Sequence, residues 1–175
     1  MNDFESKQIR EENYHLLKAR RILLDTRKGS DLLYQEKNYQ SLYESLSDAE
    51  VREIAEVDLT LFALTCDPSD FKDIAAPEIY YAEMSVEERI LYECNLLILT
   101  NRWQRSIAKF PNEILYNTKS NLFTALSKLT FTQIQALARK GTCLSKIVIS
   151  PQAFEKFVLN PQMTIEERRC TLLVG

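Results

Sequence analysis

The side chains of this sequence that are best suited to bind a ligand are basic residues of its second half. Six of them are candidate DNA-binding residues: Arg139, Lys140, Lys146, Lys156, Arg168 and Arg169. Lysine and arginine neutralise phosphates, and this pattern fits contacts to the nucleic-acid backbone better than the reading of base edges. The alternative for any one of these residues alone is an ordinary solvated surface.

The charge distribution supports a role for these residues as a group. Residues 1–94 contain 11 basic and 21 acidic residues, whereas residues 95–175 contain 11 basic and 4 acidic residues. The resulting net charges are −10 and +7, and such asymmetry indicates that the two halves face different partners. The acidic half either serves solubility or forms a surface for a basic partner.

The residue types that build catalytic or metal sites are scattered along the chain. Cys66, Cys94, Cys143 and Cys170 form no C-x-x-C pair, and His15 is the single histidine. The sequence also lacks a nucleophile motif and a glycine-rich phosphate loop. We therefore expect reduced cysteines, no metal, no cofactor and no small-molecule substrate, in a protein that is not an enzyme.

Neither a membrane span nor a secretory signal is predicted. The longest apolar run, residues 96–99, is far shorter than the roughly 20 residues that cross a bilayer. Residues 1–6 are polar and acidic, where a secretory signal would be basic and then apolar. We expect a cytoplasmic protein that does not associate with membranes.

An internal repeat determines how these residues are positioned. Residues 46–56 align with residues 129–139 at an offset of 83, which also relates Leu61 to Leu144 and Pro68 to Pro151. Upstream, Asn13 matches Asn95 and Arg20 matches Arg102 at an offset of 82. We divide the chain into repeat 1, residues 1–93, which is acidic, and repeat 2, residues 94–175, which is basic. The repeats are expected to share a continuous helix around residues 86–109 and to fold as one domain.

Each repeat has the sequence pattern of several helices. Apolar residues recur at helical spacing over residues 6–27 and 86–109, which predicts two amphipathic packing helices. Ser47 and Thr130 are predicted N-caps of shorter helices that end near Asp58 and Gly141. Residues 74–81, around Pro77, are the expected irregular linker.

Short strands and further helix starts follow in both repeats. Leu59–Thr65 and Leu144–Ser150 are rich in apolar and β-branched residues, and we expect them to pair as an antiparallel ribbon. Asp67-Pro68 and Ser150-Pro151 predict a cap followed by proline in the first helical turn. Ser85 with Glu88, and Thr164 with Glu167, are predicted capping boxes. The predicted fold is all-α, a pseudo-dimer of two tandem helical repeats with a short two-stranded ribbon between them.

Three segments of repeat 2 carry a family resemblance. Leu126–Arg139, followed by Leu144–Ser150 and preceded by Leu97–Trp103, resembles the FlhD family of bacterial transcription activator subunits. Repeat 1 resembles a more diverged copy of the same family unit over residues 46–67. The resemblance implies a cytoplasmic subunit that joins an FlhC-like zinc-binding partner to activate promoters of flagellar or conjugative-element genes, and that binds promoter DNA within the complex.

The sequence departs from the family pattern in two ways, which concern the stoichiometry with a partner and the disulfide between protomers. Family members are short and homodimerise, whereas this chain contains two copies, so the stoichiometry with a partner is open. The family cysteine that links protomers falls near Lys146 and Ala63 in this sequence, and we expect no such disulfide. The alternative function is a helical adaptor or chaperone-like protein of a secretion or conjugation system that does not bind DNA.

Overall fold

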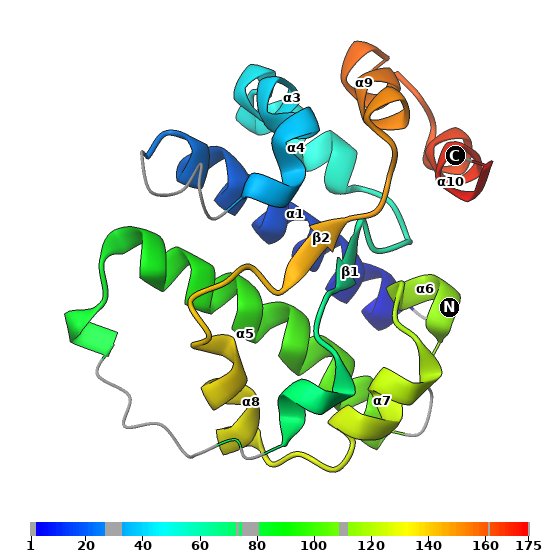
Figure 1. The fold of residues 1–175 in the computed structure, drawn as a ribbon. Coiled ribbons are helices and arrows are strands. Elements are labelled where there is room, and N and C mark those ends of the chain that lie inside the picture. Colours follow the sequence, from blue (N-terminus) through cyan, green and yellow to red (C-terminus); the bar gives the residue numbers. More distant parts are fainter. Residues whose placement is uncertain are drawn as a thin grey trace. The chain divides into compact units, whose positions relative to one another are not determined.

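The structure, a computed structural model, is mostly helical, as the sequence predicts. It describes residues 3–26, 33–72, 74, 81–108, 112–160 and 162–174. The α-helices in these ranges are α1 (Asp3–Leu24), α3 (Gln40–Ser45), α4 (Asp48–Ala55), α5 (Val86–Ile107), α6 (Glu113–Tyr116), α7 (Ser120–Leu126), α8 (Phe131–Ala138), α9 (Pro151–Leu159) and α10 (Ile165–Val174) (Figure 1). The 3₁₀ helices are η1 (Tyr34–Tyr39), η2 (Pro68–Phe71) and η3 (Tyr81–Glu83), and the strands are β1 (Phe62–Leu64) and β2 (Ser145–Ile147). None of these helices is long and apolar enough to cross a membrane.

Local hydrogen bonds explain where the helices begin. The Ser47 hydroxyl accepts the N–H of Glu50, whose carboxylate accepts the N–H of Ser47, and Thr130 and Gln133 form the same pair at α8. Each reciprocal pair satisfies two backbone donors that the first helical turn leaves free. The capping box at Ser85 opens α5, which is continuous to Ile107. The predicted linker residue Pro77 lies outside the described residues.

The two strands form the antiparallel ribbon that the sequence predicts, in a shorter form. The N–H of Thr65 donates to Leu144 O at 2.9 Å, and the N–H of Val148 donates to Leu61 O at 2.9 Å. The strands begin late because the N–H groups of Leu61 and Leu144 donate to asparagine side chains of the helices instead of to the ribbon. The pairing therefore covers three residues of each strand.

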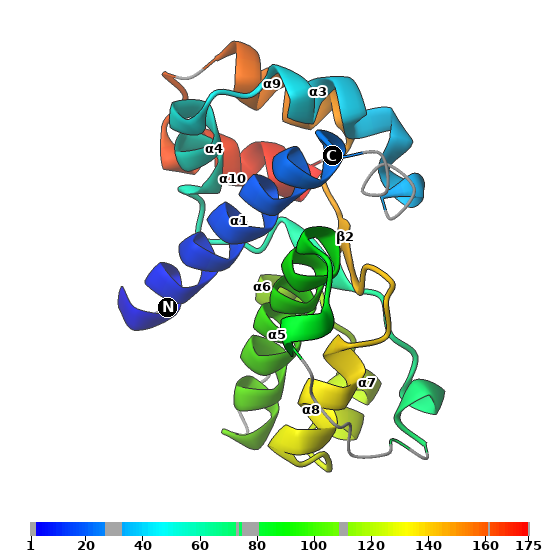
Figure 2. The same cartoon turned by 90° about the vertical axis from the view of Figure 1, so that its left-hand side faces the viewer.

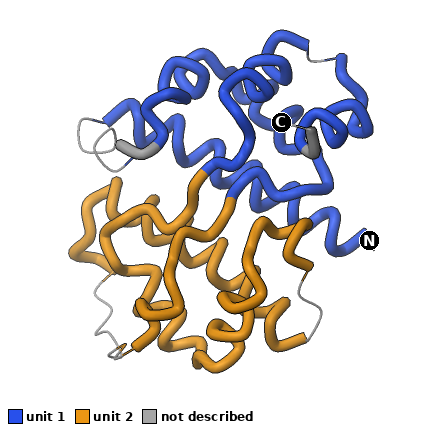
Figure 3. The backbone as a smooth tube through the Cα atoms, turned by 45° about the vertical axis from the view of Figure 1, so that its right-hand side comes forward, with its two compact units in different colours: residues 1–62, 147–175 blue, residues 63–146 orange. Residues whose placement is uncertain are grey.

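The backbone divides into two compact units whose residue ranges differ from those of the sequence repeats (Figure 3). Unit 1 comprises residues 1–62 and 147–175, and unit 2 comprises residues 63–146. The chain enters unit 2 within β1 and returns to unit 1 within β2. Each unit thus combines the leading helices of one repeat with the closing segment of the other. As a result, unit 1 has 12 basic and 16 acidic residues and unit 2 has 10 and 9, a smaller contrast than that between the repeats.

Unit 1 is built around α1, which packs against α3 and α4, while α9 packs against α4 and α10. Its core includes Leu16 and Leu17 of α1, which are fully buried. The ring of Phe154 on α9 lies 5.6 Å from the ring of Tyr43 on α3. The closing segment of repeat 2 therefore completes the core formed by the leading helices of repeat 1.

Unit 2 is built around α5, which packs against α7 and α8 (Figure 2). Ile98 and Leu99 of α5, Leu126 of α7 and Ile134 of α8 are fully buried. The short helix η2, from repeat 1, packs against α7. Unit 2 therefore supports the segment that carries Arg139, Lys140 and Lys146.

Candidate nucleic-acid interface

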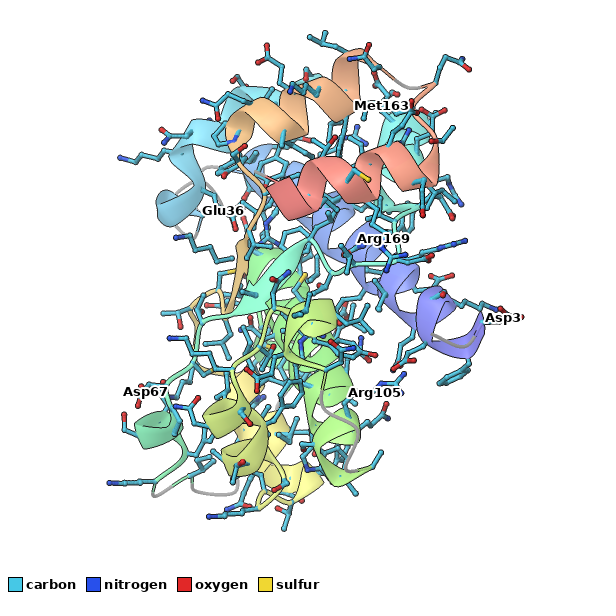
Figure 4. The ribbon with its side chains drawn as sticks, turned by 90° about the vertical axis from the view of Figure 1, so that its right-hand side faces the viewer. Asp3, Glu36, Asp67, Arg105, Met163 and Arg169 are labelled. Atoms are coloured by element: carbon cyan, nitrogen blue, oxygen red, sulfur yellow. The ribbon has the colours of Figure 1, made fainter. Side chains whose placement is uncertain are left out.

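The six predicted DNA-binding residues are divided between the two units. Three of them, Arg139, Lys140 and Lys146, belong to unit 2, and the other three, Lys156, Arg168 and Arg169, belong to unit 1. Lys146 on β2 and Lys156 on α9 are exposed. Arg169 on α10, labelled in Figure 4, is exposed as well. The chain returns to unit 1 at residue 147, so the basic second half of the sequence is divided between the two units. Unit 2 contains the basic residues of repeat 2 up to residue 146, and only three of the six predicted residues belong to it.

Arg139 and Lys140 lie at the end of α8. Arg139 is the C-cap residue of that helix and is half-buried. Lys140 is exposed, and its Nζ lies 2.9 Å from Asp70 Oδ1. The hydrogen bond from Lys140, with the N–H of Asp67 and the charge of Lys140, holds the pKa of Asp70 below its usual value. Because both partners are solvated, this ion pair contributes little to stability.

Arg168 is buried, which differs from the prediction that it contacts phosphate. Arg168, in unit 1, is 3% exposed, whereas the neighbouring Arg169 is exposed. Burial lowers the pKa of Arg168, and the charges of Glu53 and Glu56 act in the opposite direction. Adjacent helix positions point about 100° apart, so a sequence pair of arginines does not share one face of α10. Arg169 is the surface member of this pair.

Arg102, another basic residue of repeat 2, is also inside the fold. Its Nε donates to Thr118 Oγ1 at 3.1 Å, and its guanidinium lies 4.9 Å from the centre of the Tyr116 ring. The residue is fully buried in unit 2. Arg102 therefore contributes to the core of unit 2, and its side chain cannot contact DNA at the surface.

Four exposed lysines of unit 2 come from its α7, α8 and β2 region: Lys119, Lys128, Lys140 and Lys146. Lys72, beside η2, is exposed as well. Lys119 is the N-cap of α7, and Lys128 lies in the turn that precedes α8. Residues 95–146 contain eight basic residues and a single acidic one, Glu113. This segment is the most basic part of the chain, and Lys119 and Lys128 belong to it although the six predicted residues did not include them.

The side chain of Asn95 holds part of this basic segment in place. Its Nδ2 donates to Ala138 O at 3.1 Å and to Thr142 O at 2.8 Å, and its Oδ1 accepts the N–H of Leu144 at 2.8 Å. Asn95 is fully buried on α5. It therefore fixes both ends of residues 138–144, and with them the position of Arg139 and Lys140.

Asn13 makes the equivalent contacts in unit 1. Its Nδ2 donates to Leu59 O at 3.0 Å, and its Oδ1 accepts the N–H of Leu61 at 2.8 Å. Leu59 and Leu61 precede Thr142 and Leu144 by the offset of 83 found in the sequence. Both repeats thus use one asparagine to attach their long helix to the segment that leads into the ribbon.

A buried charged cluster in unit 1 was not anticipated from the sequence. Arg20 donates from Nε to Glu36 Oε2 at 2.6 Å and from a terminal nitrogen to Oε1 at 2.8 Å. The Tyr43 hydroxyl and the Ile147 N–H also donate to this carboxylate, at 2.8 and 2.9 Å. Burial alone raises the pKa of Glu36, but the charge of Arg20 and these hydrogen bonds outweigh it and hold the pKa below its usual value. The match of Arg20 with Arg102 was the available sequence signal, and it did not identify Glu36 as the partner.

An apolar patch accompanies the basic segment in unit 2. The Trp103 ring lies 5.9 Å from the Phe131 ring, and its Nε1 donates to Leu129 O at 2.9 Å. Phe131 is 45% exposed, and Ile107, one helical turn after Trp103, is 50% exposed. Exposed aromatic and aliphatic side chains of this kind are enriched where proteins bind other proteins.

The described residues contain no group of three or more histidine, cysteine, aspartate or glutamate side chains that could hold a metal ion. His15 is exposed and lies 3.5 Å from Glu11 on the same helix. No protein-family model matches the sequence, and no curated protein and no solved structure is significantly similar to it. The chemistry of the described surface, together with the sequence resemblance, is therefore the basis for a functional proposal.

Proposed function

We propose that this protein is a non-enzymatic subunit of a cytoplasmic transcription activator, which binds promoter DNA in a hetero-oligomer with an FlhC-like zinc-binding partner. The observation that carries the proposal is the basic segment of unit 2, in which eight basic residues accompany one acidic residue. The segment also includes most of the residues that resemble the FlhD family.

The exposed lysines of unit 2 suit backbone contacts. A lysine ammonium attracts a phosphate without reading the base, so Lys119, Lys128, Lys140 and Lys146 would supply affinity and not sequence preference. Sequence preference would then come from the partner or from DNA shape. A protein that supplies affinity while its partner supplies sequence preference acts as a co-activator within a complex and does not regulate promoters alone.

An adaptor or chaperone-like role in a secretion or conjugation system is the second candidate. The apolar patch of Trp103, Ile107 and Phe131 favours it, because this patch suits a protein partner and has no role in phosphate binding. The same patch also fits the partner subunit of the first candidate. The two functions are therefore separated by DNA binding and not by the presence of a protein complex.

A cross-linked pull-down of the tagged protein from the cells that produce it naturally tests the proposal. The protein partners are identified by mass spectrometry, and the DNA in the same sample is sequenced. The proposal predicts an FlhC-like partner together with discrete DNA regions upstream of promoters. A matched sample from a variant with Lys119, Lys128 and Lys146 changed to alanine should retain the partner and lose the DNA enrichment. Secretion or conjugation proteins without enriched DNA would refute the proposal and establish the adaptor.

A further inference from the structure

The two units carry different residue pairs at one matched position of their packed helices. In unit 1, α1 packs against α4, and Arg21 of α1 forms an ion pair at 2.5 Å with Asp48, the first residue of α4. In unit 2, α5 packs against α8, and the ring of Trp103 contacts that of Phe131, the first residue of α8. Trp103 follows Arg21 by 82 residues. Phe131 follows Asp48 by 83 residues, so unit 2 has an aromatic pair where unit 1 has an ion pair at its surface.

The third residue of the apolar patch differs between the units in the same way. Ile107, one helical turn after Trp103, matches Asp25 of unit 1 at the offset of 82, and both side chains are exposed. Unit 1 thus forms its helix pair with charged residues at all three positions, so packing of this helix pair does not require tryptophan, isoleucine and phenylalanine there. Grouped apolar side chains that are exposed, and that the fold does not require, indicate a surface that binds a partner.

The sequence around the apolar patch is basic and lacks carboxylates. Lys128 is exposed and immediately precedes Leu129, whose carbonyl accepts the hydrogen bond from Trp103 Nε1. Residues 94–112 and residues 114–146 contain no aspartate or glutamate. A partner that carries acidic residues around its apolar contact is therefore complementary to this surface in charge. Such charges at the rim of an interface determine mainly the choice of partner and the rate of association, while the apolar contact provides affinity.

We propose that the apolar patch of Trp103, Ile107 and Phe131 binds an amphipathic helix of a protein partner, whose apolar face is flanked by acidic side chains. The patch consists of one turn of α5, from Trp103 to Ile107, and the start of α8. One helix can cover such a surface with apolar residues at positions i, i+3 and i+4. Trp103 is the central anchor, because Phe131 and the carbonyl of Leu129 hold its ring in place. The proposal rests on the proposed function only in assuming a protein partner, since DNA has no part in this contact.

Selection of peptides on the full chain tests this proposal. The probe is a displayed library of helical peptides without tryptophan, with varied apolar residues on one face and glutamate, glutamine or lysine on both sides of that face. The selected peptides should be enriched in glutamate. Resynthesised with lysine in place of each glutamate, they should bind at least about tenfold more weakly in fluorescence anisotropy. Trp103 is the single tryptophan of the chain, so its emission should shift to shorter wavelength when a selected peptide covers it.

The control variant transfers the residues of unit 1 to unit 2, as Trp103→Arg, Ile107→Asp and Phe131→Asp together. It should keep the circular dichroism spectrum of the parent, because unit 1 forms the matched helix pair with these residues, and it should bind the selected peptides at least about tenfold more weakly. Ile107→Asp alone changes an exposed side chain, retains Trp103 as the reporter and should also weaken binding. This single variant decides the outcome if the triple variant does not fold.

Equal peptide affinity in the parent and in Ile107→Asp would overturn the proposal, as would selection of lysine-flanked peptides or of none at all. Self-association of the parent that Ile107→Asp abolishes would overturn it as well, because a second copy of the chain would then cover the apolar patch. Since the experiment contains no DNA, its failure leaves the proposal of DNA binding intact.

Discussion

In unit 1 the buried Arg20 faces the carboxylate of Glu36, whereas in unit 2 the matched Arg102 donates to the hydroxyl of Thr118. Glu36 and Thr118 are themselves related by the offset of 82 that relates the two arginines. The asparagines and arginines are the same in both units, and the asparagines bind matched backbone groups, whereas the partners of the arginines differ. The comparison shows that the repeats retain a hydrogen-bonding framework, while unit 1 has placed an ionised carboxylate in its core at the position where unit 2 has a neutral hydroxyl.

The largest expected effect comes from removing the carboxylate of unit 1. Glu36→Gln preserves the shape of the side chain but leaves Arg20 without its ionised partner, which should lower the free energy of unfolding by about 3–5 kcal/mol. The matched change in unit 2, Thr118→Val, removes a hydroxyl that accepts a hydrogen bond from the Arg102 guanidinium, and it should cost less, about 1.5–3 kcal/mol. Urea denaturation at pH 7 measures both. Equal losses would contradict the distinction between a carboxylate and a hydroxyl as the partner of the buried arginine.

The shared framework makes the opposite prediction for the asparagines, since both units should respond alike. Asn13→Ala and Asn95→Ala each leave buried backbone groups without their side-chain partner, so each should cost about 2–4 kcal/mol in the same denaturation experiment. Asn13→Asp and Asn95→Asp serve as controls that keep the acceptor for the N–H of Leu61 or Leu144 and lose the donor. A stable Asn95→Ala protein beside an unstable Asn13→Ala protein would show that the framework is not equivalent in the two units.

Acid should weaken the ionic contribution of unit 1 specifically. The pKa of Glu36 is lower in the folded protein than its ordinary value of 4.5, so its contribution is complete above that value and is lost as the pH falls through the folded pKa. The stability difference between the parent and Glu36→Gln should therefore be constant near neutral pH and shrink below about pH 4.5. Thr118→Val should show a constant difference over the same range. A gap for Glu36→Gln that does not change with pH would mean that Glu36 is not ionised in the folded protein.

The smallest expected effect concerns the matched helix caps. Ser47→Ala and Thr130→Ala each remove one side of a capping box and should each cost about 1 kcal/mol, with little difference between α4 and α8. Thermal denaturation followed by circular dichroism can measure both changes. Serine at residue 130 is the control, since it retains the hydroxyl that accepts the Gln133 N–H. A cost for Ser47→Ala well above that for Thr130→Ala would indicate that α4 depends on its cap more than α8 does.

The helix starts and the ribbon could be predicted because they depend on residues close together in the chain. The capping residues Ser47, Ser85 and Thr130 satisfy donors within the next turn, and the apolar segments before Pro68 and Pro151 form the strands. Such signals can be read from one sequence because cap and donor are three residues apart. Helices α4, α5, α8, α9 and α10 accordingly begin at the predicted caps, whereas α3, α6 and α7 begin where no cap was predicted.

The buried cations and the composition of the units could not be predicted in the same way. Arg20 and Glu36 come from different elements, and a charged pair leaves no periodic apolar signal. Arg102 and Arg168 look like surface residues by type, and only the packing of α5 and α10 shows that they are buried. The return of the chain to unit 1 at residue 147 divides the basic half, and it depends on long-range packing that a net charge cannot reveal.

The most direct test of the central claim, that unit 2 binds promoter DNA within a complex, is the salt dependence of DNA affinity for the complex with its partner. Lys119, Lys128 and Lys146 are changed together to alanine, and the exposed Lys7, Lys18 and Lys37 of unit 1 are changed together in the matched control. The slope of log affinity against log salt concentration should become shallower by about 0.9 for each lost phosphate contact in the unit 2 variant and stay unchanged in the control. Identical slopes in the parent and both variants, or no salt-dependent DNA binding by the complex at all, would contradict the account.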